Sequence, residues 1–332
     1  MKALRLTTTI LAAAALSAVV LLSGPPGANA ADKPVKIGIS MRTLSAPYYG
    51  ALQQAVEKEA KVQGATTIAV DANDDMVKQI SDVEDLLSQN IDVLVMDPRD
   101  AKGLVGVTKE AAAAKVPVVI IDSSIDDSAP VLTTIQSNNA ENGKLVGEYV
   151  VSQVGNKDLK IALLSGDQGN LVGEARRDGV MSGILEAQLR QNGRAGFTVV
   201  GQGWGLWTQN GGVKAMEDLL TAHPDINAVL AENDSMALGA LRAIQDAGKA
   251  GNNILVFAAA DGQKEAVKLI SEGKYGATGL NDPSLIGKMG ADLAIKAARG
   301  QVPAGYPKIT YTPPVVITKA NAAQYYKSDA LF

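Results

Sequence analysis

Short β-branched runs that alternate with amphipathic segments constrain the fold of this chain more than any other feature. From residue 35 onward, predicted helices at 48–62, 75–88 and 104–114 separate the apolar runs VKIGISM, TTIAV, IDVLVMD and VPVVIID. In the second helix Val77, Ile80, Val83 and Leu87 fall on one face. Strands that alternate with helices predict a parallel sheet covered on both faces.

The same alternation starts again after residue 134. Helices are predicted at 138–154 and 174–191, and two more are predicted to end at Leu220 and at Ala247. They separate the runs KIALLSG, FTVVGQ, INAVLAEND and NILVFAAADG. Asn138 and Glu141 have the spacing of a capping box. A chain of 332 residues exceeds what one core usually serves. We therefore expect an α/β protein with two doubly wound parallel-sheet lobes.

The N-terminal segment predicts export. A basic start is followed by the apolar run TTTILAAAALSAVVLL and the small-residue stretch SGPPGANA, which together are typical of a secretory signal. We place the signal peptide at residues 1–30, with cleavage after Ala30. A membrane anchor is the alternative, but the run is short for a spanning helix and Gly24, Pro25 and Pro26 interrupt it.

The composition excludes several classes of site and partner. Cysteine is absent, which excludes a disulfide scaffold, a cysteine-based metal site and a lipid-attached cysteine. An exported receptor without a lipid anchor must be retained by an outer envelope, so we expect the periplasm of a Gram-negative cell. The net charge of −4 with no basic block argues against nucleic acid as a partner. Neither a metal nor a cofactor is expected.

Polar residues follow most of the predicted strands. They are Arg42 to Tyr49, Asp97, Asp122 with Ser123, Gly166 with Asp167, Asn233 with Asp234, and Asp261. In a doubly wound sheet, ligands bind beyond the carboxyl ends of the strands. Any single Asp or Asn at such a turn is more often a helix cap than a ligand group, so the expectation of a binding site depends on their recurrence.

Aromatic residues make up only 4% of the chain, so their positions are informative. Tyr48 and Tyr49 follow the first strand, while Trp204 and Trp207 lie in the predicted loop GQGWGLWTQN. A sugar presents apolar C–H faces and hydroxyls, which a flat ring together with carboxylates and amides can bind. Ordinary packing is the alternative for each ring.

The chain resembles the ribose-binding type of periplasmic receptor, whose fold is shared by the sensing domain of lac-repressor-like regulators. The segment AHPDINAVLAENDSMALGALRAIQDAGK carries most of the resemblance, together with SAPYYGALQQAVEKEA, VPVVIIDSS, QSNNAENGKLVGEYV and ADGQKEAVKLISEG. The resemblance implies a type I periplasmic binding fold with three crossings near residues 137–138, 281–282 and 310–312. The N-terminal lobe would comprise 31–137 and 282–311, and the C-terminal lobe 138–281 and 312–332. The ligand would be bound by hinge closure.

The resemblance also implies which residues bind the ligand. The expected ligand-binding residues are Tyr48, Tyr49, Asp122, Ser123, Arg176, Trp207, Asn233, Asp261 and Asn281. Ser45 and Ala46 stand where ribose receptors carry asparagines, and Ser123 stands where they carry an arginine. These departures point away from ribose towards a polyol or another pentose or hexose, although Arg42 or Gln168 could replace the missing arginine.

The function implied is that of the substrate-binding component of an ABC importer, with a monosaccharide or sugar alcohol as ligand and a membrane permease as partner. We expect a monomer. A chemotaxis or quorum-signal receptor, acting through a chemoreceptor, is the alternative. An enzyme is not expected, because the one histidine, His223, lies in a TAHPD turn and GQGWG lacks the complete dinucleotide fingerprint. A regulator would need a DNA-reading helix-turn-helix where the export signal stands.

Overall fold

A computed structural model describes residues 33–249 and 253–332, so the predicted signal peptide at 1–30 lies outside the described residues. The first of its two sheets has six strands in the order β11-β5-β4-β3-β1-β2, and every pairing in it is parallel. Its strands are β1 (Lys36–Met41), β2 (Thr66–Asp71), β3 (Val93–Met96), β4 (Val118–Ile121), β5 (Thr133–Ser137) and β11 (Ile309–Thr312).

The second sheet also has six strands, in the order β12-β10-β9-β8-β6-β7. Its strands are β6 (Leu159–Ser165), β7 (Phe197–Trp204), β8 (Ala228–Ala231), β9 (Leu255–Asp261), β10 (Thr278–Leu280) and β12 (Val316–Ile317). Only β12 pairs in an antiparallel sense, with β10. Two parallel α/β lobes are thus present, and this prediction of the fold class is confirmed.

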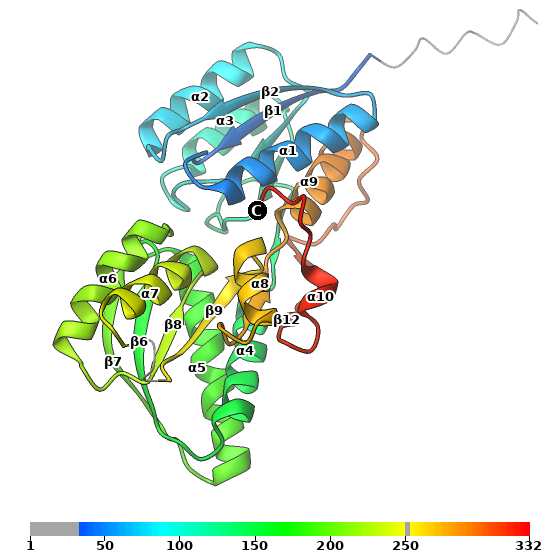
Figure 1. The fold of residues 1–332 in the computed structure, drawn as a ribbon. Coiled ribbons are helices and arrows are strands. Elements are labelled where there is room, and N and C mark those ends of the chain that lie inside the picture. The colour runs from blue at the N-terminus through cyan, green and yellow to red at the C-terminus, as the bar shows by residue number, and fades with distance from the viewer. Residues whose placement is uncertain (1–32, 250–252) are drawn as a thin grey trace, which may run out of the picture. The chain divides into compact units, whose positions relative to one another are not determined.

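Helices cover both faces of each sheet (Figure 1). On the first sheet, one face carries α1 (Pro47–Val62) and α9 (Pro283–Ala298), and the other carries α2 (Met76–Ser88) and α3 (Val105–Ala113). On the second sheet, one face carries α6 (Gln209–Ala222), α7 (Asp234–Asp246) and α8 (Lys264–Ser271), and the other carries α4 (Asn139–Val154) and α5 (Leu171–Asn192). The short α10 (Ala322–Tyr325) packs against α8. No helix of the described residues is long and apolar enough to cross a membrane.

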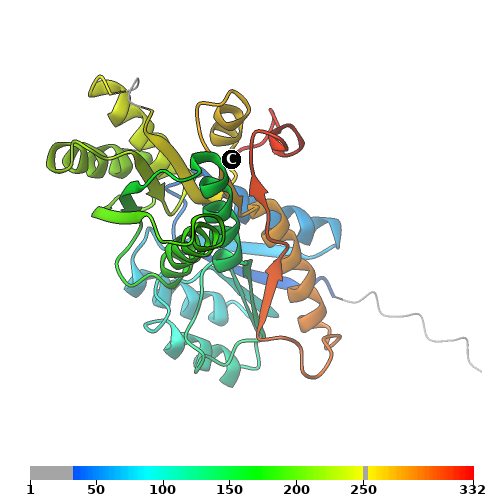
Figure 2. The same ribbon diagram turned by 90° about the horizontal axis from the view of Figure 1, so that it is seen from below.

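Helices α4 and α5 lie side by side, as both views show (Figure 2). Glycines make this approach possible, because a Cβ atom at Gly143 would lie 2.4 Å from the carbonyl oxygen of Arg176. A Cβ atom at Gly179 would likewise lie 2.2 Å from the carbonyl oxygen of Ala140. The close packing brings Arg176 of α5 next to Asn139 at the start of α4.

Three segments that lead from one sheet to the other meet at Ser137. The Ser137 hydroxyl donates to Oδ1 of Asn281 at 2.6 Å and lies 3.3 Å from the hydroxyl of Thr312. These residues follow or end β5, β10 and β11. The hydrogen bonds therefore join the three connections to one another.

The boundaries of β7 and α5 differ from the sequence prediction at positions close to the site. Strand β7 continues to Trp204, so that residue ends a strand instead of lying in a loop. Helix α5 begins at Leu171 rather than at 174, because the Asn170 side chain caps it by accepting from the N–H of Gly173 at 3.0 Å. The predicted cap at Asn138 is present, with its side chain accepting from the N–H of Glu141 at 3.2 Å.

Candidate ligand-binding site

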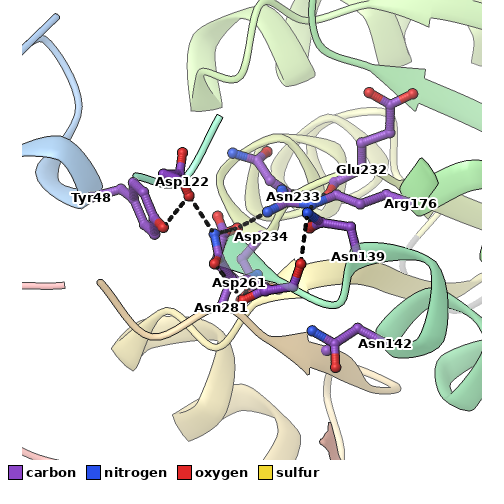
Figure 3. Close-up of polar contacts among 12 residues, drawn as sticks. Tyr48, Asp122, Asn139, Asn142, Arg176, Glu232, Asn233, Asp234, Asp261 and Asn281 are labelled. Atoms are coloured by element: carbon purple, nitrogen blue, oxygen red, sulfur yellow. Dashed lines mark hydrogen bonds and ion pairs between the residues drawn. The ribbon is translucent and has the colours of Figure 1, made fainter. Parts of the chain in front are cut away.

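A small cavity lies where the loops that follow the strands of both sheets come together. All nine residues expected to bind the ligand line it, and Figure 3 shows several of them pointing toward one another. The lining residues are Arg42, Ala46, Tyr48, Tyr49, Asp122, Ser123, Asn170, Val172, Arg176, Trp207, Asn233, Ser235, Asp261 and Asn281. The parallel strands end here, which is why residues far apart in the sequence converge.

Two tyrosines at the start of α1 form one side of the cavity. The rings of Tyr48 and Tyr49 meet edge to face, with centroids 5.5 Å apart and an angle of 89°. The Tyr48 ring also meets the ring of Phe332 edge to face, with centroids 5.1 Å apart. Burial raises the pKa of both phenols, so both remain protonated at neutral pH.

Asp122 connects this tyrosine pair to the second sheet. Its Oδ1 accepts from the phenol of Tyr48 and from Nδ2 of Asn281, the latter at 3.3 Å. The described residues provide Oδ2 with no hydrogen-bond partner. Asp122 adopts a φ of +61°, a conformation that aspartate tolerates better than most residues. One carboxylate oxygen is therefore available to accept from a hydroxyl group in the cavity.

Arg176 is fixed by two hydrogen bonds and one ion pair and is almost fully buried. Its Nε donates to Oδ1 of Asn139 at 2.9 Å, and Nη1 donates to the carbonyl oxygen of Glu232 at 3.1 Å. Nη2 lies 3.0 Å from Oδ1 of Asp261. A guanidinium carries five N–H groups, so two remain for other acceptors.

Asp261 ends β9 and is paired with Arg176 inside the protein. Its Oδ1 also accepts from Nδ2 of Asn281 at 3.3 Å. Burial raises the pKa of this carboxyl to about 6, although the positive charge of Arg176 acts in the opposite direction. The group is therefore mostly ionised at neutral pH and can accept hydrogen bonds.

Asn233 is mainly a helix cap. Its Oδ1 accepts from the N–H of Met236 at 3.0 Å at the start of α7, and its Nδ2 donates to the carbonyl oxygen of Trp207 at 3.1 Å. One N–H of its amide remains for a ligand. The next residue, Asp234, is fully buried, and its Oδ2 accepts from the N–H groups of residues 261–263. Its role is structural: it fixes the turn after β9.

The indole of Trp207 forms a second flat wall. It occupies a slot beside Gly166, where a Cβ atom would lie 1.9 Å from Cε2 of the indole. The guanidinium of Arg176 lies 5.8 Å from the ring centroid. Trp204 is 40% exposed and does not line the cavity, so Trp207 is the tryptophan at the site.

Arg42 and Gln168 were the two residues considered as replacements for the arginine that ribose receptors carry at position 123. Arg42 lines the cavity, whereas Gln168 lines a neighbouring cavity together with Ser123. The Arg42 guanidinium is buried, and its Nη2 donates to Asp74 at 2.7 Å and to Asp167 at 3.0 Å. The alternation of strands and helices gave no indication of these partners.

Two buried acids, Asp97 and Glu232, do not line the cavity. Asp97 was among the polar residues expected after the strands, whereas Glu232 was not. Glu232 accepts from the N–H of Gly166 at 2.9 Å and pairs with Arg177 at 2.7 Å. Neither carboxylate oxygen of the fully buried Asp97 has a hydrogen-bond partner among the described residues. Burial and the negative charge of Asp122 raise the pKa of Asp97 to about 8, although Arg42 acts in the opposite direction.

The histidine and the glycine-rich sequence that were weighed as features of an enzyme lie in regular secondary structure or at its end. His223 is the C-cap of α6, and its N–H donates to the carbonyl oxygen of Leu219 at 2.8 Å, as its turn sequence predicts. The described residues contain no cluster of three or more His, Cys, Asp or Glu side chains that could hold a metal ion. The GQGWG sequence lies mostly in β7 instead of in a phosphate-binding loop.

Comparisons with known proteins agree with this arrangement. Residues 37–301 match the family model described as a periplasmic binding protein domain. The chain is 37% identical over 276 residues to the ribose import binding protein RbsB of Bacillus subtilis, which covers 83% of this chain and 86% of the relative.

Solved structures show the same fold. An ABC transporter solute-binding protein from Mycobacterium smegmatis with bound glycerol superposes with a TM-score of 0.82 at 35% identity, covering 90% of this chain and 99% of that one. A solute-binding protein from Bacillus halodurans with bound myo-inositol gives a TM-score of 0.78 at 27% identity, covering 88% and 97%.

Proposed function

Because the chain belongs to the family of periplasmic binding proteins, we propose that its cavity binds a neutral sugar alcohol, or a monosaccharide other than ribose. Members of the family are solute-binding proteins and not enzymes. The chain is accordingly a sugar-binding substrate-binding component of an ABC importer, and it acts outside the cytoplasm.

The combination of side chains around the cavity carries the proposal. Asp122 and Asp261 supply carboxylate oxygens, Arg176 supplies two N–H groups, and the rings of Tyr49 and Trp207 supply flat apolar surface. A polyhydroxylated carbon skeleton needs all three kinds of partner. Asp122 and Asp261 balance the positive charges of Arg42 and Arg176, the two arginines that line the cavity. An anionic ligand is therefore disfavoured.

Ser123 supports a ligand other than ribose. Its short side chain lines both this cavity and a neighbouring polar cavity that also contains Gln168, and Asn170 and Val172 line both as well, so the two cavities adjoin. A longer polyol or a hexose has an additional hydroxyl group that this space can accept. The relatives named above are a ribose import binding protein and solute-binding proteins with bound glycerol and with bound myo-inositol, which favours testing a wide range of polyols.

A thermal-shift screen followed by calorimetry tests the proposal. Pentoses, hexoses, inositols and linear polyols are added to the purified protein, and a tight ligand raises the melting temperature by mass action. Asp122→Ala is expected to weaken the binding free energy of the best ligand by about 1.5–3 kcal/mol, because it removes a charged hydrogen-bond acceptor. If no carbohydrate raises the melting temperature, the proposed ligand class is wrong.

We further propose export through residues 1–30 into the periplasm of a Gram-negative cell, with the mature monomer starting at Ala31. N-terminal sequencing of the secreted protein tests the cleavage site.

The proposed lobes comprise residues 31–137 with 282–311 and residues 138–281 with 312–332, and they would close over the ligand as a hinge. The second proposal is a role as a chemotaxis or quorum-signal receptor for a small sugar-like ligand, and chemotaxis in a permease-deletion strain tests it.

A further inference from the structure

We propose that Asp167, which does not line the cavity, is a positioning residue that links the orientation of the Trp207 ring to the approach of the first-sheet loops. The inference rests on the proposed function, because it assigns the Trp207 ring to the ligand-binding surface. It adds a residue that determines affinity from outside the site.

The first link lies within the second sheet. Nε1 of Trp207 donates to Oδ2 of Asp167 at 3.0 Å. Trp207 and the preceding Leu206 have φ values of +62° and +51°, which non-glycine residues adopt only with external support. The support comes from the indole bond to Asp167 and from the bond between the Trp207 carbonyl and Asn233 at 3.1 Å. Asp167 therefore fixes the pyrrole edge of the indole.

The second link joins the two sheets. The same Oδ2 of Asp167 accepts from Nη2 of Arg42 at 3.0 Å, and Nη1 of Arg99 lies 3.7 Å away. Arg42 follows β1 and Arg99 follows β3, whereas Asp167 follows β6. The side chains of Arg42 and Asp167 are only 4% and 14% exposed, so water screens this pair weakly.

One carboxylate oxygen of Asp167 thus accepts from the Trp207 indole in its own lobe and from the Arg42 guanidinium of the other lobe. Arg42 can reach it only when the first-sheet loops approach the second sheet as they do here. The ion pair favours that arrangement over a separated one, and apparent affinity rises with the population of the binding-competent state. The hydrogen bond to Nε1 ensures that the aromatic wall is in place in the same arrangement.

Three variants separate the two links, each made in a Trp204→Phe background so that Trp207 alone reports fluorescence. Asp167→Asn keeps an oxygen that accepts from the indole but loses the charge that attracts Arg42. Asp167→Ala loses both. Asp225→Asn is the control, since Asp225 is an exposed aspartate of the same lobe that pairs with Lys160 away from the cavity.

Asp167→Asn is expected to leave the emission maximum of ligand-free Trp207 unchanged, to weaken binding of the best carbohydrate about tenfold, and to reduce the salt dependence of that affinity. Asp167→Ala is expected to shift the emission maximum as well and to weaken binding further. Asp225→Asn should match the parent protein in all three measurements.

The inference is wrong if Asp167→Ala matches Asp225→Asn in emission and affinity. It is also wrong if the salt dependence of binding is the same for Asp167→Asn and the parent. Failure of every carbohydrate to bind the parent protein would instead contradict the proposed function. The emission of the ligand-free variants would still test the link between Asp167 and Trp207.

Discussion

The phenol of Tyr48 donates a hydrogen bond to Asp122, and this bond connects α1 to the loop after β4. Both residues line the cavity. Burial is the largest cause that raises the pKa of the Tyr48 phenol, and the negative charge of Asp122 adds to it. The bond therefore persists over the whole physiological pH range.

Tyr48→Phe is expected to lower the free energy of unfolding by about 1.5–3 kcal/mol, because it removes a hydrogen bond to a charged group and leaves Asp122 with fewer donors. Urea denaturation measures the change. Tyr49→Phe is the matched control, since the phenol of this neighbour has no hydrogen-bond partner among the described residues, and a change within about 0.5 kcal/mol is expected. Equal effects of the two substitutions would contradict a structural role for the Tyr48 phenol.

Asp97 predicts an unusual dependence of stability on pH. Its pKa is about 8 in the folded chain against 3.8 for an unperturbed aspartate, and the charged groups near it are Asp122 and Arg42. Between these two pH values the folded state binds more protons than the unfolded state. The free energy of unfolding therefore rises as the pH falls, by up to about 1.4 kcal/mol per pH unit.

Asp97→Asn should remove this slope between pH 6 and 8 and raise the stability at pH 8. Asp261 has a pKa of about 6 and contributes a slope of the same sign only below that pH. Asp126→Asn is the control, because hydrogen bonds from Ser128 lower the pKa of Asp126, so this group stays ionised between pH 6 and 8. Urea denaturation at pH 5, 6, 7 and 8 measures the slope, and an unchanged slope in Asp97→Asn would contradict the assignment.

The sequence predicts those strands whose own residues carry an apolar signal. Strands β1, β3, β4, β8 and β9 are apolar runs bounded by polar residues, and each was predicted. Strands β5, β10 and β11 have the sequences TTIQS, TGL and ITYT, which contain too few apolar residues for a local signal. Their positions depend on neighbouring strands, which are distant in the sequence.

The same distinction holds for the site. Position after a strand was enough to predict that residues such as Asp122 and Asp261 would converge, because parallel strands end at one edge. The places of Arg176 and Trp207 were implied only by the resemblance to ribose receptors. Their bonding partners could not be predicted. Asn233 uses both ends of its amide within the protein, and Arg42 meets Asp167 across 125 positions of sequence. Such pairings depend on three-dimensional geometry, which a strand-and-loop pattern does not contain.

Arg176→Gln is expected to destabilise the protein by about 3–5 kcal/mol at pH 8, because it leaves Asp261 as a buried carboxylate without its cation. The loss should be smaller at pH 5. Burial already raises the pKa of Asp261 to about 6, and without Arg176 it would rise further, so the carboxyl is neutral at the lower pH.

Urea denaturation of parent and variant at both pH values measures this difference. Arg190→Gln is the control: Arg190 pairs with Glu148 on the surface and is 65% exposed, so its loss should cost at most about 1 kcal/mol at either pH. A cost for Arg176→Gln that does not depend on pH would mean that its other two hydrogen bonds, and not Asp261, account for its stabilising effect.

Gly166→Ala tests whether the position of the Trp207 ring determines affinity. The added Cβ would lie 1.9 Å from Cε2 of the indole, so the ring must move, whereas the backbone of Gly166 is not in the left-handed region. We expect the best carbohydrate to bind at least about tenfold more weakly, with a shifted Trp207 emission. Gly106→Ala in α3 is the control, because nothing lies within 4 Å of its Cβ position and alanine favours a helix. A displaced ring with unchanged affinity would show that the carboxylates and Arg176 hold the ligand without the aromatic wall.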